Sequence, residues 1–326
     1  MYYIIVNPAS KSGRGRKLWA KLEPVFRLQN IPYRVVFSKG AGHVTRLVAK
    51  LTAPDRLPAD AAPLKLILLG GDGTVNEALQ GVVDFNRIWL GYIPTGSSND
   101  LARDLRLPKD PALILETILK GNVVRTLDLG TLSYGNTDGN TDGNADTDTG
   151  KEIRYFAVSS GIGFDAAVCE EALSSRFKKT LNRMGLGKLT YLSIALKQLV
   201  AAKSVSCDIY LDDAKEPVHF RRFLFTAFMI HRYEGGGFQF CPMADATDGK
   251  LDLCVVGRIP KPVILFALPT AFFGKHYMFP AIRHYAASKA VVHSSIPLWV
   301  HTDGEVSRKA DEITVTCTKR QIRLMM

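Results

Sequence analysis

Glycines and a carboxylate stand together directly after an apolar stretch, residues 64–69, that is expected to be a buried strand. They are Gly70, Gly71, Asp72, Gly73, Thr74, Val75 and Asn76. The apolar spacing over 75–83 predicts a helix. At such a turn the backbone can approach a phosphate closely, and the helix N-terminus favours its charge. A tight turn in a doubly wound sheet would explain the glycines but not Asp72, which we interpret as a Mg²⁺ site facing nucleotide phosphates.

A second polar segment follows the strand-like residues 88–93. Its candidate phosphate or ribose ligands are Gly96, Ser97, Asn99 and Asp100. Alone, this segment is equally well explained as a serine-rich turn with a helix N-cap. Ligands of open α/β sheets lie outside the carboxyl ends of the strands. Both segments would lie there, which favours a shared binding site.

Other charged residues fit the same chemistry, each with a structural alternative. Lys11 lies in a basic loop without the P-loop signature, and Arg103 could meet a phosphate or headgroup. Both could also be solvated surface cations. Phosphoryl transfer to an alcohol needs a carboxylate that accepts the hydroxyl proton, and Asp303 with Glu305 could serve, or form an Asp-Gly turn.

Another Asp-Gly turn precedes the strand-like residues 251–256. It is common hairpin chemistry, but its oxygen-rich spacing also permits a hard cation. The oxygen donors would come from Asp245, Asp248 and Lys250.

Residues 1–125 alternate between two periodicities. Strands are expected at 2–6, 33–37, 64–69 and 89–93, and helices at 17–29, 43–51, 75–83 and 111–119. Such alternation implies a parallel sheet with helices on both faces. The fold class is therefore α/β, with an N-terminal doubly wound, Rossmann-like nucleotide-binding domain.

From about residue 126 short β-like runs dominate. They cover 126–132, 154–159, 206–211, 220–230, 251–256, 290–293 and 298–301. Helices are expected at 164–177, 189–203 and 261–273. The pattern predicts a second, β-sandwich domain over 126–312. Residues 313–326 are expected to return to the first domain.

Residues 135–150 form a low-complexity insertion that lacks large apolar residues to bury and is expected to be a disordered hairpin. Asp138, Asn140 and Asp142 open like a calcium loop, but position twelve is Thr149 instead of glutamate. Calcium binding and a catalytic role are therefore not expected.

The net charge of +11 over 326 residues indicates an anionic partner, which could be phospholipid, nucleotide or nucleic acid. Five scattered cysteines without a CxxC pair suit a reducing cytoplasm. The N-terminus lacks the features of a signal peptide. The longest apolar run, 263–274, contains Pro269 and is too short to span a bilayer, so any membrane contact is expected to be peripheral.

One family carries these motifs in this order. Besides the segments above, the match includes Asn7-Pro8, Gly161-Ile162-Gly163-Phe164-Asp165, Gly235-Gly236-Gly237 and Gly274-Lys275-His276. Over nearly its whole length the chain resembles the bacterial soluble diacylglycerol kinases and related lipid kinases. Sphingosine kinases and, more distantly, NAD kinases share their catalytic fold.

The resemblance implies an active site in the cleft between the two domains. It implies ATP contacts at Gly71 to Asn76, at Ser97 and at Ser38. It implies a catalytic Mg²⁺ organised by Asp72 through water, and a structural Mg²⁺ held by Asp245, Asp248 and the Lys250 carbonyl. Asp303 would accept the proton, supported by Glu305.

We therefore expect an ATP-dependent lipid kinase that phosphorylates a lipid hydroxyl, most simply that of diacylglycerol. The expected partners are ATP, Mg²⁺ and an anionic membrane surface, with a homodimer possible and no nucleic acid. Two alternatives stay open at this point. One is a kinase of a soluble alcohol, as in NAD kinases, and the other is a non-catalytic nucleotide or lipid sensor.

Overall fold

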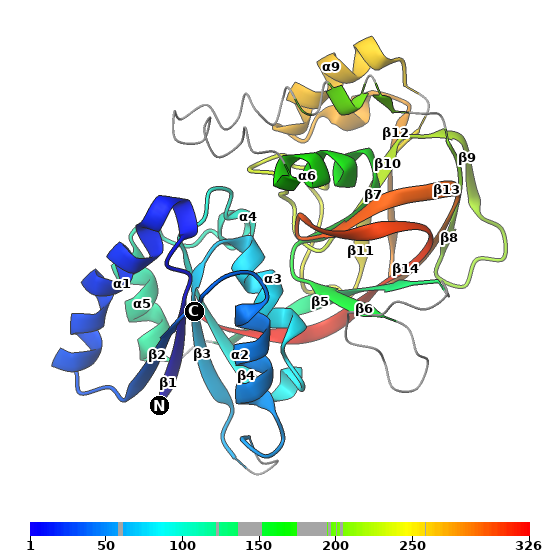
Figure 1. The fold of residues 1–326 in the computed structure, drawn as a ribbon. Coiled ribbons are helices and arrows are strands. Elements are labelled where there is room, and N and C mark those ends of the chain that lie inside the picture. The colour runs from blue at the N-terminus through cyan, green and yellow to red at the C-terminus, as the bar shows by residue number, and fades with distance from the viewer. Residues whose placement is uncertain are drawn as a thin grey trace.

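The computed structural model describes residues 1–57, 61–121, 124–135, 152–174, 194, 197–199, 201–202, 205–257 and 259–326. Figure 1 shows two halves side by side, one with helices around parallel strands and one dominated by antiparallel strands. Most of the 135–150 insertion and most of the helix expected over 189–203 lie outside the described residues. No helix in the described part of the chain has the length and apolar character needed to cross a membrane.

The N-terminal half contains four parallel strands in the order β4-β3-β1-β2. The strands are β1 (Tyr2–Val6), β2 (Tyr33–Phe37), β3 (Leu64–Gly70) and β4 (Ile88–Pro94). The helices are α1 (Ser10–Leu28), α2 (His43–Thr52), α3 (Asp72–Gln80), α4 (Asp100–Asp104) and α5 (Pro111–Lys120), with a 3₁₀ turn η1 (Phe85–Arg87).

Both faces of this parallel sheet are covered, as the apolar strands require. Ile4 of β1 belongs to a buried cluster with Trp19 and Phe26 of α1. Ile5, the next residue, points to the other face and joins a cluster with Val48 of α2. The alternation of adjacent β1 residues between two cores places helices on both sides of the sheet.

The C-terminal half is built from antiparallel pairs. Its strands are β5 (Val124–Tyr134), β6 (Ile153–Phe156), β7 (Ser159–Gly163), β8 (Val205–Leu211), β9 (Val218–Phe223), β10 (Phe225–Met229), β11 (Leu251–Val256), β12 (Ile282–Ala287), β13 (Lys289–Thr302) and β14 (Glu305–Met325). Its helices are α6 (Phe164–Ser174) and α9 (Lys261–Ala271), with a 3₁₀ turn η2 (His276–Met278).

Strand β14 joins the two halves. It pairs with β13 and β5 in the antiparallel half, and its Leu324 lies beside Leu90 of β4 in parallel register. The C-terminal residues therefore reach the N-terminal half within one long strand, β14. The domain limits at 125 and 313 remain predictions, because a continuous strand crosses the second of them.

Several element limits differ from expectation for identifiable reasons. Helix α1 begins at Ser10 instead of residue 17, because Gly15 is needed for close packing and not for a loop: a Cβ there would lie 2.0 Å from the Asn7 carbonyl oxygen. Lys11 is therefore in the first turn of a helix. Helix α3 begins at Asp72, three residues before the predicted Val75.

The antiparallel half also departs from expectation. The runs expected over 154–159 and 220–230 are each divided between two strands, and the runs at 290–293 and 298–301 are parts of one strand, β13, with register shifts. Strand β12 was not predicted. The helix expected over 164–177 is α6, which ends at Ser174, and residues 175–177 lie outside the described ones.

Candidate functional site

The two polar segments of the N-terminal half meet at the carboxyl ends of β3 and β4. A Cβ on Gly96 would lie 2.6 Å from the Gly71 Cα, so both positions need glycine for the backbones to touch. The Thr95 N–H donates to the Gly70 carbonyl at 2.7 Å. Helix α3, which is nine residues long, begins where the two segments meet. The expected proximity of the two segments is confirmed.

Asp72, the first residue of α3, is held by backbone donors from the second segment. Its carboxylate accepts from the Asp100 N–H at 3.0 Å and more weakly from the Leu101 N–H at 3.4 Å. The Tyr92 hydroxyl lies 3.5 Å away. Burial and the charge of Asp100 raise the pKa of Asp72 to about 6, with a smaller contribution from the charge of Asp303. The ionised form of Asp72 is thus destabilised by burial and by neighbouring carboxylates, and a bound cation would stabilise it.

Asp100 is the second acid of this crowded pair. One oxygen, Oδ2, accepts from the Gly236 N–H at 2.8 Å. The other, Oδ1, is buried and has no hydrogen-bond partner among the described residues, although the Arg103 Nε lies 3.8 Å away. Burial raises the pKa of Asp100. Two carboxylates with an unsatisfied oxygen are a donor set that fits Mg²⁺.

Asp303 lies in the turn between β13 and β14 with a positive φ of 50°. Its Oδ1 accepts from the N–H groups of Val158 (2.8 Å) and Ser159 (3.0 Å). Its Oδ2 accepts from the Ala157 N–H (3.0 Å) and from the Asn76 side-chain amide of α3 (2.9 Å). Because a carboxylate offers about four lone-pair positions, all of its acceptor sites are occupied in this arrangement.

Glu305 brings a further acid to the same place. A Cβ built on Gly73, in the first turn of α3, would lie only 2.7 Å from the Glu305 Oε1. The N-terminal part of α3 therefore contains Asp72, its Gly73 lies against Glu305, and its Asn76 donates to Asp303. The structure brings together the three residues predicted as catalytic, of which Asp72 is far from the other two in the sequence.

Other predicted ligands have structural partners. The amide of Asn99 closes its own loop, because its Oδ1 accepts from the Gly96 N–H and its Nδ2 donates to the Gly96 carbonyl. Thr74 is buried and accepts from the Asn7 amide at 3.1 Å. Ser97 is exposed, and Ser38 follows β2, where its N–H donates to Val6.

Arg103 is not a free surface residue. It lies over the Tyr233 ring at 5.6 Å and donates to the Gly236 carbonyl at 3.4 Å. These contacts tie α4 to the 234–238 loop of the other half. Lys11, by contrast, is exposed at the start of α1, and no contact among the described residues holds its side chain toward the site.

The turn predicted to hold a structural Mg²⁺ is stabilised by a residue that the sequence did not indicate. Buried Asp128 accepts from the N–H groups of Gly249 (2.6 Å) and Arg320 (2.8 Å). Asp245 and Asp248 are exposed. Their carboxylates accept from Thr247 and from the Lys250 N–H within the turn. Asp128 thus supplies a link that needs no metal.

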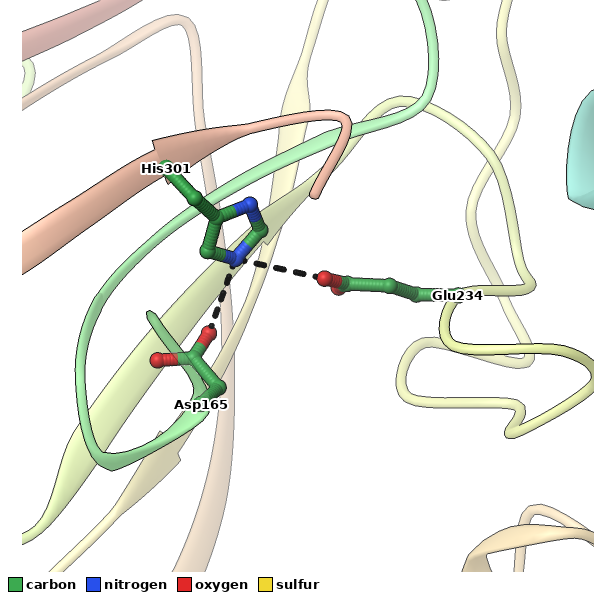
Figure 2. Close-up of side chains that lie close together, drawn as sticks. All are labelled: Asp165, Glu234 and His301. Atoms are coloured by element: carbon green, nitrogen blue, oxygen red, sulfur yellow. Dashed lines mark hydrogen bonds and ion pairs between the residues drawn. The ribbon is translucent and has the colours of Figure 1, made fainter. Parts of the chain in front are cut away.

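A second polar cluster, which was also not predicted as a site, lies next to the Asp303 turn. Figure 2 shows Asp165 and Glu234 pointing at one ring nitrogen of His301, each at 3.2 Å from Nε2. His301 is fully buried. Burial and the charge of Asp165 raise the pKa of Glu234 to about 7.

These three side chains have the spacing of a metal site, but the histidine is in the wrong tautomer. The Gly304 N–H donates to His301 Nδ1 at 3.1 Å, so Nδ1 carries no proton. In a neutral imidazole the proton is then on Nε2, which therefore donates to the two acids and has no lone pair for a cation. The cluster is a hydrogen-bonded clamp on the Asp303 turn.

Known proteins match the chain over almost all of its length. Residues 1–132 match the model of the diacylglycerol kinase catalytic domain. Residues 157–326 match that of the YegS C-terminal NAD kinase β-sandwich-like domain. The second match supports a β-sandwich for the C-terminal half, so the predicted fold class is confirmed.

Individual relatives agree with these models. A diacylglycerol kinase of Mycobacterium tuberculosis is 30% identical, covering 74% of this chain and 70% of its own. A diacylglycerol kinase of Bacillus subtilis is 26% identical, covering 93% and 88%. A crystal structure of a diacylglycerol kinase from Bacillus anthracis has the same fold, with a TM-score of 0.66, 18% identity and coverage of 99% and 96%. The chain therefore belongs to the diacylglycerol kinase family of lipid kinases.

Proposed function

We propose that this protein transfers the γ-phosphoryl group of ATP to the hydroxyl of a membrane lipid, and that the lipid is diacylglycerol, which gives phosphatidic acid. The observation that carries the proposal is the convergence of Asp72, Asp303 and Glu305 on the N-terminal turn of α3. A phosphate-binding helix end and a set of acids for metal and proton are the two parts that phosphoryl transfer requires. Relatives named diacylglycerol kinase support the choice of lipid.

The backbone of the α3 turn would position the phosphates. Gly71 and Gly73 allow the close approach of Gly96 and Glu305, and the first N–H groups of α3 would point toward the phosphate oxygens. Asp72 and Asp100 would hold Mg²⁺, which offsets negative charge on the phosphates when it is bound. Ser97, which is exposed in the second segment, would contact the nucleotide.

In the chemical step the lipid hydroxyl oxygen forms a bond to the γ-phosphorus, and the bond from that phosphorus to the β,γ-bridging oxygen breaks. The hydroxyl proton goes to Asp303. Since all four acceptor positions of Asp303 are occupied, one donor must leave first. We assign this to Asn76, because the other three donors are backbone N–H groups of one rigid segment.

The Asn76 bond also joins the two halves of the molecule, since Asn76 belongs to α3 and Asp303 to the β13–β14 turn. A small opening between the halves would break this bond and expose the Asp303 Oδ2 to the substrate. The resting arrangement is therefore one in which the base is protected. Substrate entry would free the base.

The decisive experiment is transfer of radiolabel from [γ-³²P]ATP into diacylglycerol in mixed micelles, with Mg²⁺ present. Labelled phosphatidic acid is expected with wild-type protein. Asp303→Asn should lower kcat by at least about 10³-fold, within the range of general-base catalysis, without weakening ATP binding. Asp213→Asn, at an exposed position between β8 and β9, is the matched control and should keep full activity.

Near wild-type turnover in Asp303→Asn would refute the assigned base. Label in a different lipid would keep the mechanism and change the substrate. Label in a soluble alcohol alone would indicate the NAD-kinase-like alternative. ATP binding without any transfer would favour a sensor. We also propose a homodimer, which analytical ultracentrifugation of the same preparation would test.

A further inference from the structure

Helix α9 and the turn after it expose large apolar side chains. Phe266 and Phe273 are each 73% exposed, whereas Ala267 and Ala271 are buried. Phe266 lies in α9, and Phe273 lies in the turn directly after the helix. Figure 1 shows α9 at the outer edge of the C-terminal half. We call this surface the α9 apolar face, which consists of Leu265, Phe266, Phe272, Phe273 and Met278.

A basic groove lies beside the N-terminal end of α9. Its volume is about 720 Å³, and its lining includes Arg221, Arg222, Arg283 and Val263. The three arginines are exposed, and none of them forms an ion pair with a carboxylate of the described residues. Arg283 lies over the Phe220 ring at 5.9 Å, which keeps its guanidinium at the groove. We call this feature the arginine groove.

The sequence around these two features has one sign of charge. No aspartate or glutamate occurs in the 50 residues from Leu253 to Thr302. The same stretch contains Arg258, Lys261, Lys275, Arg283 and Lys289. Exposed phenylalanines flanked by unpaired cations match the two chemistries of an anionic bilayer, whose acyl chains take the rings and whose headgroups pair with the arginines.

A chain of aromatic rings connects the α9 apolar face to the candidate active site. Phe272 stacks on Phe238 with centroids 3.9 Å apart, and Phe238 stacks on Phe240 at 5.8 Å. Phe238 closes the loop in which Gly236 bonds to Asp100 and Arg103. An apolar route therefore runs from the exposed face to the residues proposed to hold Mg²⁺.

We propose that the α9 apolar face and the arginine groove together dock the enzyme on an anionic phospholipid bilayer, with the rings in the acyl region and a phosphate headgroup in the groove. This deepens the proposed function and rests on it, because a diacylglycerol substrate must be taken from a membrane. Docking at α9 would place the aromatic route against the bilayer, so that the substrate reaches Asp303 without crossing water.

The test is co-sedimentation of the full chain with vesicles, independent of any turnover. Wild-type protein should bind vesicles of phosphatidylcholine with about 30% phosphatidylglycerol and bind pure phosphatidylcholine much less. Phe266→Ser/Phe273→Ser should weaken the partition coefficient by at least about tenfold, since each ring loses apolar burial. Arg221→Glu/Arg283→Glu should weaken it by about 25-fold or more, at roughly fivefold per neutralised cation, and this effect should disappear at high salt.

Matched variants on the other half control for surface polarity and net charge. Leu28→Ser/Val83→Ser removes exposed apolar residues of α1 and the α3–η1 connection, and Lys21→Glu/Lys50→Glu makes the same net charge change as the arginine variant. Both should bind vesicles as the wild type does. Circular dichroism melting of each variant separates lost docking from lost folding.

Equal binding by the α9 variant and its control would overturn the proposal, as would failure of the wild type to bind anionic vesicles. A concentration-dependent dimer that is lost in Phe266→Ser/Phe273→Ser, without vesicle binding, would assign the face to a second copy instead. Activity on short-chain, water-soluble diacylglycerol distinguishes the two hypotheses. Vesicle binding without this activity leaves docking intact and refutes the proposed function, whereas the reverse result refutes docking alone.

Discussion

Two groups of buried carboxylates in this molecule differ in the hydrogen-bond donors and charges that surround them. Asp165 and Glu234 share the Nε2 proton of His301, which is fixed in turn by the Gly304 N–H. Asp72 and Asp100 have backbone donors, and the Arg103 Nε lies 3.8 Å from the Asp100 Oδ1, an oxygen with no hydrogen-bond partner in the described part of the chain.

From this difference we infer that Asp72 and Asp100 are the group that binds a cation. Buried charge is costly unless it is paired. The His301 cluster contains its own donor, the Nε2 proton, although one oxygen of Glu234 has no hydrogen-bond partner among the described residues. No side-chain donor in the described part of the chain bonds to both Asp72 and Asp100, so a bound cation would stabilise this pair. Metal-like spacing alone favours the wrong cluster, and only the direction of the hydrogen bonds separates the two.

The largest expected effect is at Asp72. Asp72→Asn should lower kcat by about 10³-fold or more, because we propose that this residue holds the metal that stabilises developing charge. In the absence of Mg²⁺ the same change should stabilise the protein at pH 8. Burial and neighbouring charge raise the pKa of Asp72 from 3.8 to about 6, so the ionised form costs up to about 3 kcal/mol above that pH.

Urea unfolding at pH 8 and pH 4 measures this stability effect, and Mg²⁺-dependent turnover measures the kinetic one. The raised pKa means that the cost is absent below about pH 4 and complete above about pH 6. Asp72→Asn and wild type should therefore converge at pH 4. A variant less stable than wild type at pH 8 would contradict a site under charge strain.

Substituting His301 by asparagine or by glutamine separates its contact with Gly304 from its contacts with the two acids. His301→Asn can still accept the Gly304 N–H but cannot reach the acids, and we expect a loss of about 3–5 kcal/mol because Asp165 and Glu234 lose their donor. His301→Gln can reach the acids but leaves Gly304 unsatisfied, which should cost about 1–3 kcal/mol. Chemical denaturation at pH 7 would compare the two variants. The reverse order would mean that the Gly304 bond is the more important contact.

Glu234 should give the cluster a pH signature. Its pKa of about 7 in the folded state is above the ordinary value of 4.5, so stability falls as the pH rises through this interval, by up to about 3 kcal/mol. Glu234→Gln should flatten this part of the pH dependence of the unfolding free energy. An unchanged slope between pH 5 and pH 8 in the variant would show that another group titrates there.

The smallest effect is expected at Tyr92. Its hydroxyl lies 3.5 Å from Asp72 and 3.4 Å from Asn99, both at the long limit for a hydrogen bond. Tyr92→Phe should therefore change stability by less than about 1 kcal/mol and kcat by less than about fivefold. Steady-state kinetics would check this. A loss comparable with that of Asp72→Asn would show that the hydroxyl has a direct role in holding the metal or the nucleotide.

Much of the N-terminal half follows from the sequence. The limits of β1 and β2 were predicted to the residue, and the glycine-rich loop was placed at the correct end of β3. These features are local: apolar alternation, glycine at a turn and the helical period depend on neighbours in the chain. Helix α1 was predicted too short because Gly15 is explained only by its contact with Asn7, which packs there through tertiary structure.

Sequence alone identified Asp72, Asp303 and Glu305 as acids with a motif around them, and the order of motifs indicated the family. Tertiary structure decided that Asp303 has four donors, that Asp100 keeps an unpaired oxygen and that His301 presents a proton instead of a lone pair. Hydrogen-bond direction and burial depend on residues more than 100 positions apart, as in Asn76 with Asp303. Such long-range contacts leave no periodic signal in the chain, so only the folded molecule could show which donors surround each acid.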